Sequence, residues 1–92
     1  MRFILNGGSI HSRETLHQAL AAGLHLPEWY GGNLDALHDC LSQPGVENTL
    51  VVRSGAALEA ALGGYAAAFR RVLADCAAEN PQFSVVWEED TP

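Results

Sequence analysis

Residues 26–41 read Leu-Pro-Glu-Trp-Tyr-Gly-Gly-Asn-Leu-Asp-Ala-Leu-His-Asp-Cys-Leu, a pattern that predicts a loop followed by a helix. Pro27 and the pair Gly31-Gly32 are typical of a loop, and Asn33 is a suitable N-cap for the helix that follows. The apolar positions of that helix recur at the helical period, at Leu34, Leu37, Cys40 and Leu41. The stretch therefore predicts a helix with one buried face, introduced by a loop that carries two adjacent aromatic residues.

Three short apolar runs, at residues 3–5, 49–53 and 83–87, predict strands, and each connection between them has room for two helices. Strands separated by helical connections generally pair in parallel with right-handed crossovers. We therefore predict an α/β fold in which a three-stranded parallel sheet is packed with about four helices. Because the strands are apolar throughout, we expect both faces of the sheet to be largely covered.

The expected helix boundaries follow from capping and breaking residues. Ser12 and Ser54 are suitable N-caps for the first and third helices, and Pro44-Gly45 is expected to stop the second. The pattern predicts a longer fourth helix over residues 65–79. The acidic residues 88–92 are expected to form a frayed tail.

The composition describes a small acidic protein. The chain has 92 residues, 48% of them hydrophobic, which predicts one domain over residues 1–92. Asp and Glu number 11 against five arginines, so the formal net charge is −6. This balance disfavours a nucleic-acid binder and suits a basic partner, although a charge of this size also keeps many small proteins soluble. The apolar runs are far shorter than the ~20 residues of a membrane span.

The two cysteines, Cys40 and Cys76, form neither a C-x-x-C motif nor a zinc-ligand spacing. The first residues reach a polar turn too early for a signal peptide. We therefore expect a cytoplasmic protein with reduced thiols, with no membrane partner and no cofactor. A single bridge from Cys40 to Cys76 remains the alternative.

Acidic residues recur four apart on two of the predicted helices. Asp35 and Asp39 share one face of the second helix, and Asp75 and Glu79 share one face of the fourth. The two pairs could converge on one surface, but two separate solvated faces are the commoner arrangement. His38 lies beside the first pair, and carboxylates with a histidine can bind a metal. Without an H-E-x-x-H motif or a nucleophile elbow, catalysis is poorly supported and no metal site is predicted.

Three other features give weaker signals. Trp29 and Tyr30 lie in a loop, where at least one of two adjacent aromatics is expected to be exposed as in interface hot spots, and the alternative is that both fill the end of the core. The turn after the first strand resembles a phosphate-binding turn only weakly, because it lacks the G-x-G-x-x-G pattern and a lysine. The remaining histidines are expected at the surface: His11, His17 and His25.

The run quoted above resembles the signature of the barstar family, which comprises small cytoplasmic bacterial inhibitors of secreted ribonucleases. The resemblance begins at the first strand and extends, more weakly, through the final helix and strand. It also covers the residues Ile4, Asn6-Gly7, Ile10, Leu16-His17-Gln18 and Leu20. The family fold, a three-stranded parallel sheet with four helices, agrees with the fold predicted from the patterns.

The resemblance implies that the second helix and its preceding loop plug a ribonuclease active site. Asp39 matches the family's central acid, which would occupy a phosphate position and pair with arginines and the catalytic histidine. Trp29 would stack on that histidine, and of the two acids on the last helix Asp75 is favoured to touch a basic rim. The full set of expected partner-binding residues is Trp29, Tyr30, Gly31, Asn33, Asp35, His38, Asp39, Ser42, Asp75 and Glu79. The partner is then a basic bacterial ribonuclease, and the free chain a monomer.

The chain departs from the family's best-known member at the end of the binding helix. His38 and Pro44 replace tryptophans, Gln43 replaces a glycine and Ser42 a threonine. The cognate ribonuclease is therefore expected to differ. The hypotheses left open are an immunity protein that inhibits a ribonuclease, a module of the same fold that binds another basic protein, and a small metal-dependent enzyme.

Overall fold

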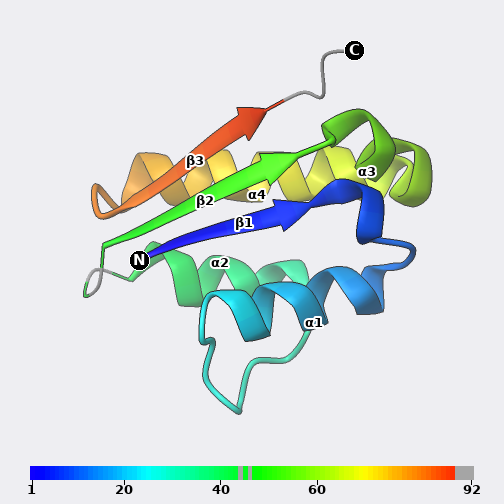
Figure 1. The fold of residues 1–92 in the computed structure, drawn as a ribbon. Helices are drawn as coiled ribbons and strands as arrows, with labels where there is room; N and C mark the ends of the chain where they lie inside the picture. Colours follow the sequence, from blue (N-terminus) through cyan, green and yellow to red (C-terminus); the bar gives the residue numbers. More distant parts are fainter. Residues whose placement is uncertain (44, 46, 89–92) are drawn as a thin grey trace.

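A computed structural model of the chain describes residues 1–43, 45 and 47–88. Three strands form one parallel sheet in the order β1-β2-β3 (Figure 1). The strands are β1 (Arg2–Asn6), β2 (Asn48–Arg53) and β3 (Phe83–Glu88). The predicted fold class is therefore confirmed. The predicted breaker Pro44 and the predicted frayed tail, apart from Glu88 in β3, lie outside the described residues.

Each crossover contains two helices. The helices are α1 (Arg13–Gly23), α2 (Leu34–Ser42), α3 (Gly55–Leu62) and α4 (Gly64–Glu79). Ser12 caps α1 as predicted, because its Oγ accepts the N–H of Thr15 and Thr15 Oγ1 accepts the N–H of Ser12. None of the described helices is long and apolar enough to cross a membrane.

The third helix begins differently from the prediction. Ser54 lies at its N-terminus, but with φ 58° and ψ 48° its backbone is left-handed, and its side chain makes no capping hydrogen bond to the first turn. An N-cap normally has an extended backbone, which aims its side chain at the first free N–H groups. The left-handed backbone at Ser54 instead turns the chain sharply from β2 into α3.

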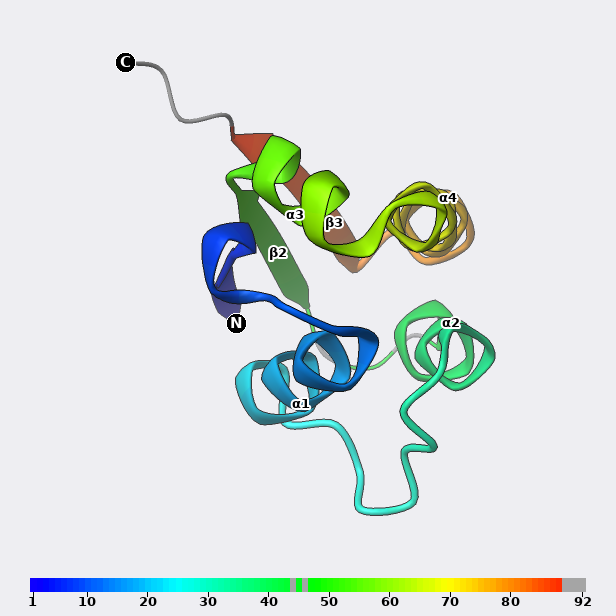
Figure 2. The same ribbon diagram turned by 90° about the vertical axis from the view of Figure 1, so that its right-hand side faces the viewer.

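The helices α1, α2 and α4 lie on one side of the sheet, and α3 lies beyond the ends of the strands (Figures 1 and 2). The outer face carries the aligned row Ile4, Val51 and Val86, one residue from each strand. Ile4 and Val86 are each 43% exposed, whereas Val51 between them is only 1% exposed. The expectation that both faces are covered is therefore wrong. Val51 is buried although it lies in the outer row, so the apolar sequence of the central strand does not distinguish the two faces.

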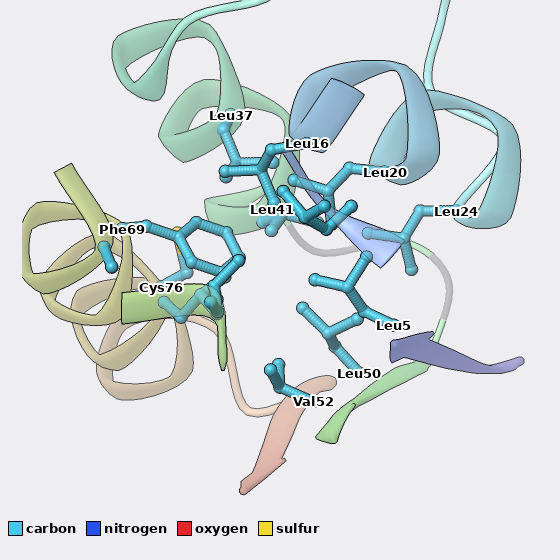
Figure 3. Packing of buried hydrophobic residues seen from close by; sticks show 14 of the residues in the cluster. Leu5, Leu16, Leu20, Leu24, Leu37, Leu41, Leu50, Val52, Phe69 and Cys76 are labelled. Carbon is cyan, nitrogen blue, oxygen red and sulfur yellow. The ribbon is translucent and has the colours of Figure 1, made fainter. Parts of the chain in front are cut away.

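The inner face of the sheet and three helices enclose a leucine-rich core (Figure 3). Alternate strand residues such as Leu5 and Leu50 meet Leu20 of α1, Leu37 of α2 and Phe69 of α4. Each of these side chains is at most 1% exposed. Burying an apolar side chain of this size contributes about 1.5–3 kcal/mol, so this core fixes the orientation of α2 about its own axis.

Gly7, in the turn η1 (Gly7–Ser9) after β1, has a structural role. A Cβ atom at this position would lie 2.5 Å from the carbonyl oxygen of Ser54 and 2.7 Å from that of Arg53. The turn therefore packs against the backbone at the end of β2, and only a residue without a side chain fits there. This close approach accounts for a glycine at position 7, so a phosphate-binding turn is not needed to explain it.

Gly7→Ala is expected to lower the free energy of unfolding by about 1–3 kcal/mol, because backbone atoms rather than a flexible side chain must move. The matched control is Gly8→Ala, where the nearest atom to the new Cβ is Asn6 Oδ1 at 3.3 Å. Urea denaturation of both variants measures the difference. Equal losses in the two variants would contradict the close approach at Gly7.

Candidate protein-binding surface

The loop before α2 starts from a defined helix end. The N–H of Leu24 donates to the carbonyl oxygen of Leu20 over 2.9 Å, and the N–H of Leu26 donates to that of Ala21 over 3.0 Å. His25 between them has φ 53°. The Leu26 bond spans this left-handed residue, as the six-residue bond of a Schellman motif does, and it satisfies a carbonyl of the last turn of α1 and sets the direction in which the chain leaves.

The two aromatic residues of the loop have different environments. The N–H of Tyr30 donates to the carbonyl oxygen of Pro27 over 2.9 Å, which closes a turn around Trp29. Trp29 is 68% exposed, while Tyr30 is half-buried and packs against the core. The expectation that at least one of the two is exposed is confirmed, and that residue is Trp29. A hollow of about 430 Å³ lies beside it, lined in part by Leu26, Cys40 and Asn80.

His17 of α1 contacts Tyr30 and is buried, contrary to the expectation from the sequence. We expected all three histidines outside α2 at the surface, but His17 is only 4% exposed, while His11 and His25 are exposed. The missed signal is spacing, since His17, Leu20 and Leu24 follow the i, i+3, i+7 pattern of the buried face. Both ring nitrogens of His17 are hydrogen-bonded to tyrosine hydroxyls, so neither nitrogen is left without a partner when the ring is buried.

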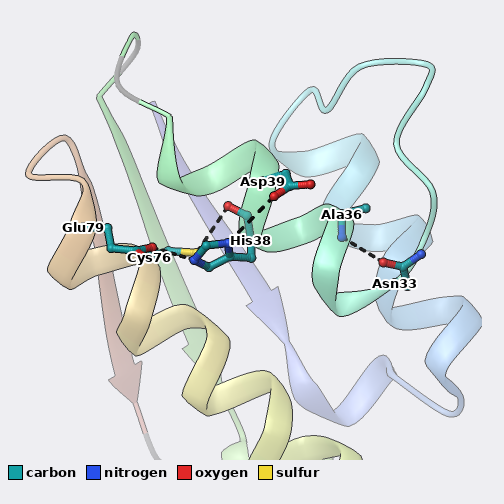
Figure 4. Close-up of polar contacts among 6 residues, drawn as sticks. All are labelled: Asn33, Ala36, His38, Asp39, Cys76 and Glu79. Atoms are coloured by element: carbon teal, nitrogen blue, oxygen red, sulfur yellow. Dashed lines mark hydrogen bonds and ion pairs between the residues drawn. The ribbon is translucent and has the colours of Figure 1, made fainter.

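Side-chain hydrogen bonds cap both ends of helix α2. At its start Asn33 Oδ1 accepts the N–H of Ala36 over 2.8 Å, as predicted for an N-cap (Figure 4). At its end the buried Asn80, the C-cap of α4, donates from Nδ2 to the carbonyl oxygens of Leu41 and Gln43 over 3.0 and 3.2 Å. The sequence does not reveal this role of Asn80, because nothing local shows which carbonyls its side chain reaches.

The acidic pairs lie on neighbouring helices, since α2 packs against α4. His38 lies between Asp39 and Glu79 (Figure 4), with Nε2 2.5 Å from Glu79 Oε2 and Nδ1 3.9 Å from Asp39 Oδ1. The Asp39 side chain is 72% exposed, and Asp35 and Asp75 are also exposed. We call these four carboxylates the acidic face. His38 therefore joins the two pairs, which periodicity alone did not reveal.

The arginines with described partners are paired elsewhere. Arg53 Nε lies 3.0 Å from Glu88 Oε1, the Arg13 guanidinium lies 4.4 Å from the centre of the Tyr65 ring, and that of Arg70 lies 4.1 Å from the centre of the Trp87 ring. Within residues 1–43, 45 and 47–88, no arginine forms an ion pair with Asp35, Asp39 or Asp75. Their negative charge is therefore not neutralised by a neighbouring guanidinium.

The thiols near this face are not activated. Cys40 and Cys76 are both free, so the alternative of a bridge between them is not adopted. Burial, followed by the charges of Glu79 and Asp75, raises the pKa of Cys76 to about 12. Burial and Asp39 also raise the pKa of Cys40. Thiols in this condition are poor nucleophiles at neutral pH.

Among the described residues no three His, Cys, Asp or Glu side chains are grouped so as to hold a metal ion.

The expected partner-binding residues all lie on the loop, on α2 or on the neighbouring part of α4. The exposed ones are Trp29, Gly31, Asn33, Asp35, Asp39, Asp75 and Glu79, and the half-buried ones are Tyr30, His38 and Ser42. The arrangement offers carboxylates and an exposed indole on a surface whose backbone is fixed by caps. Such a surface is suited to binding a cationic protein.

The His38–Glu79 pair is expected to contribute about 0.2–1 kcal/mol to the free energy of unfolding, because both side chains are more than a third exposed. A double-mutant cycle of His38→Ala and Glu79→Ala, measured by urea denaturation, gives this coupling. The control cycle of His38→Ala with Asp75→Ala is expected to be additive. Additivity in both cycles would show that the pair contributes nothing.

Comparison with known proteins gives a family match and a similar protein. The family model described as Barstar (barnase inhibitor) matches residues 1–88. A protein of Bacillus subtilis (strain 168) named "Putative ribonuclease inhibitor YrdF" is 33% identical over 89 residues, which cover 95% of this chain and 98% of that relative.

Proposed function

The chain belongs to the barstar family of barnase inhibitors, and from this premise we propose that it inhibits a ribonuclease by occupying its active site. The observation that carries the proposal is the acidic face of α2 and α4, which has no arginine counter-ion among the described residues. The exposed Trp29, in the loop that leads into α2, adds an apolar contact to it. The inhibition needs neither a covalent bond nor a cofactor.

The chemistry of a ribonuclease active site suits a carboxylate-bearing inhibitor. An enzyme that cleaves a polyanion lines its active site with arginine, lysine and histidine. Carboxylates can take the phosphate positions of such a site, because guanidinium groups pair with both kinds of anion. Asp35 and Asp39 are one helical turn apart, with about 5–6 Å between Cβ atoms at that spacing, so both reach the same cleft. A helix presents them without offering a bond that the enzyme can cleave.

Each other part of the surface has a proposed role. Trp29 stacks on the catalytic histidine, as an exposed indole supplies a large contact area at low entropic cost. Asp75 and Glu79 contact the basic rim, with Asp75 the stronger candidate because Glu79 already pairs with His38. Gly31, Asn33 and Ser42 complete the edge of the contact. The caps at both ends of α2 reduce the entropy lost on binding.

The net charge of −6 completes the proposal. A negative inhibitor and a positive enzyme attract over about one Debye length, roughly 8 Å at physiological ionic strength, which accelerates their encounter. We propose a bacterial, cytoplasmic immunity protein, monomeric when free, whose target is a secreted or toxin-borne ribonuclease. Direct binding of nucleic acid is not part of this function, because the acidic face repels phosphates.

A second candidate function is binding of another basic protein by the same surface. The observation that favours it is His38, which engages Glu79 in this chain where the family's best-known member has a tryptophan. With Gln43 exposed one turn later, the end of α2 presents a different surface. A bacterial ribonuclease encoded beside this chain would favour inhibition over this alternative.

Asp39→Ala is expected to weaken inhibition of the cognate ribonuclease by about 30-fold to several thousand-fold, since truncating one partner of a buried charge pair costs about 2–5 kcal/mol. An RNA-cleavage assay with increasing inhibitor gives the inhibition constant. The control Glu59→Ala removes the same charge from the exposed surface of α3 and is expected to change the constant less than about threefold. An unchanged constant in Asp39→Ala would contradict the proposed binding mode.

Salt is expected to slow association strongly. Raising the ionic strength from about 0.05 to 0.5 M shortens the Debye length and weakens the attraction of the acidic face for the enzyme. Stopped-flow measurement of the association rate tests this, and the variant Asp35→Asn is expected to show a smaller salt dependence than wild type. A rate that does not vary with salt would remove the electrostatic part of the proposal.

A further inference from the structure

His17 connects three parts of the fold through one buried ring. Its Nδ1 is hydrogen-bonded to the hydroxyl of Tyr30 in the loop, and its Nε2 lies 2.6 Å from the hydroxyl of Tyr65 on α4. The rings also touch, with centroids 5.7 Å apart for Tyr30 and 6.0 Å for Tyr65. A single imidazole on α1 therefore ties the loop before α2 to α4.

The loop depends on this contact more than on any other side-chain hydrogen bond. Within the described part of the chain, Tyr30 is the one residue of the segment 25–32 whose side chain is hydrogen-bonded to a helix. The other polar contacts of the segment are backbone bonds within the loop or to α1. Trp29 precedes Tyr30 directly, so the position of the Tyr30 ring limits the directions in which the exposed indole can point.

We infer that His17 is a positioning residue for the proposed binding surface, which holds Tyr30 and thereby presents Trp29 to the ribonuclease. The role rests on the proposed function, but the loop contact itself does not. His17 cannot touch the enzyme, because it is only 4% exposed. It acts through Tyr30.

The protonation state of His17 decides whether this contact holds. In the neutral ring one nitrogen donates and the other accepts, so one tyrosine hydroxyl accepts a hydrogen bond and the other donates one. In the imidazolium both nitrogens donate, so the hydroxyl that donated must rotate its hydrogen away and accept instead, and a charge is left in the interior. The described neighbours do not compensate it: Arg13 lies over the Tyr65 ring, and Glu14 lines a second hollow together with His17 but forms no described ion pair with it.

The sign of the pH dependence follows from burial. Desolvation lowers the pKa of His17 below its ordinary value near 6.5. A chain with the loop released and the ring hydrated binds the proton more readily than the closed form. The contact is therefore fully present above about pH 6.5 and is lost progressively as the pH falls toward the lowered pKa. Burial raises the pKa of Tyr30 and of Tyr65, so neither hydroxyl ionises in this range.

The test compares His17→Leu with Tyr65→Phe in the full chain. Tyr65→Phe removes one hydrogen bond of the cluster, and His17→Leu removes that bond and the one to Tyr30, so the difference between the variants isolates the Tyr30 contact. Amide hydrogen exchange gives protection factors for residues 25–33, with β2 as the internal reference. In His17→Leu we expect the loop to lose at least about tenfold in protection at pH 7, and in Tyr65→Phe less than about threefold.

Two further readouts separate positioning from a general loss of stability. The inhibition constant against the cognate ribonuclease is expected to rise at least about tenfold in His17→Leu and less than about threefold in Tyr65→Phe. In wild type the loop's protection relative to β2 is expected to fall between pH 7.5 and pH 5, and in His17→Leu to stay constant. If His17→Leu does not fold, the wild-type pH series and Tyr30→Phe, which should loosen the loop, decide the question.

Each outcome has one meaning. Unchanged loop protection in His17→Leu, or a wild-type loop insensitive to pH, overturns the inference. A loosened loop with unchanged inhibition also overturns it, because Trp29 would not need His17. If the wild-type chain inhibits no ribonuclease, the proposed function fails, while the exchange experiment still decides whether His17 holds the loop.

Discussion

The packing of Leu37 and Leu41 into the leucine core is the interaction on which the rest of the proposed surface depends. Once these two side chains are buried, the helical period leaves Asp35 and Asp39 on the solvent side. The same orientation brings His38 against α4 and within 2.5 Å of Glu79. A core built for stability therefore also determines where the charges point.

Like charges on one face lower the stability of the fold, so stability does not account for the acidic face, whereas binding a cationic partner does. Carboxylates four residues apart on a helix repel each other by a few tenths of a kcal/mol. His38 offsets part of this for Glu79, but no described arginine does so for Asp35, Asp39 or Asp75. A cationic partner would provide the missing counter-charges. The caps at Asn33 and Asn80 keep α2 in place while those charges are unpaired.

The sequence predicted what depends on local pattern and missed what depends on distant contacts. The strands, the four helices and the Asn33 cap follow from period, composition and capping, and the structure confirms them. The open face of the sheet was missed, because the strands are apolar throughout and Val51 is buried in a row with two exposed neighbours. The buried His17 and the reach of Asn80 to α2 were missed for a related reason. Their partners lie far along the chain, and family resemblance rather than periodicity singled out Trp29.

The most direct test of the account is the type of inhibition shown by the purified chain against its cognate ribonuclease. If the acidic face occupies the active site, the chain competes with RNA. The apparent inhibition constant should then rise linearly with substrate concentration, and a nucleotide bound at the active site should slow association. An apparent constant that does not vary with substrate, while the nucleotide and the chain bind together, would contradict the account.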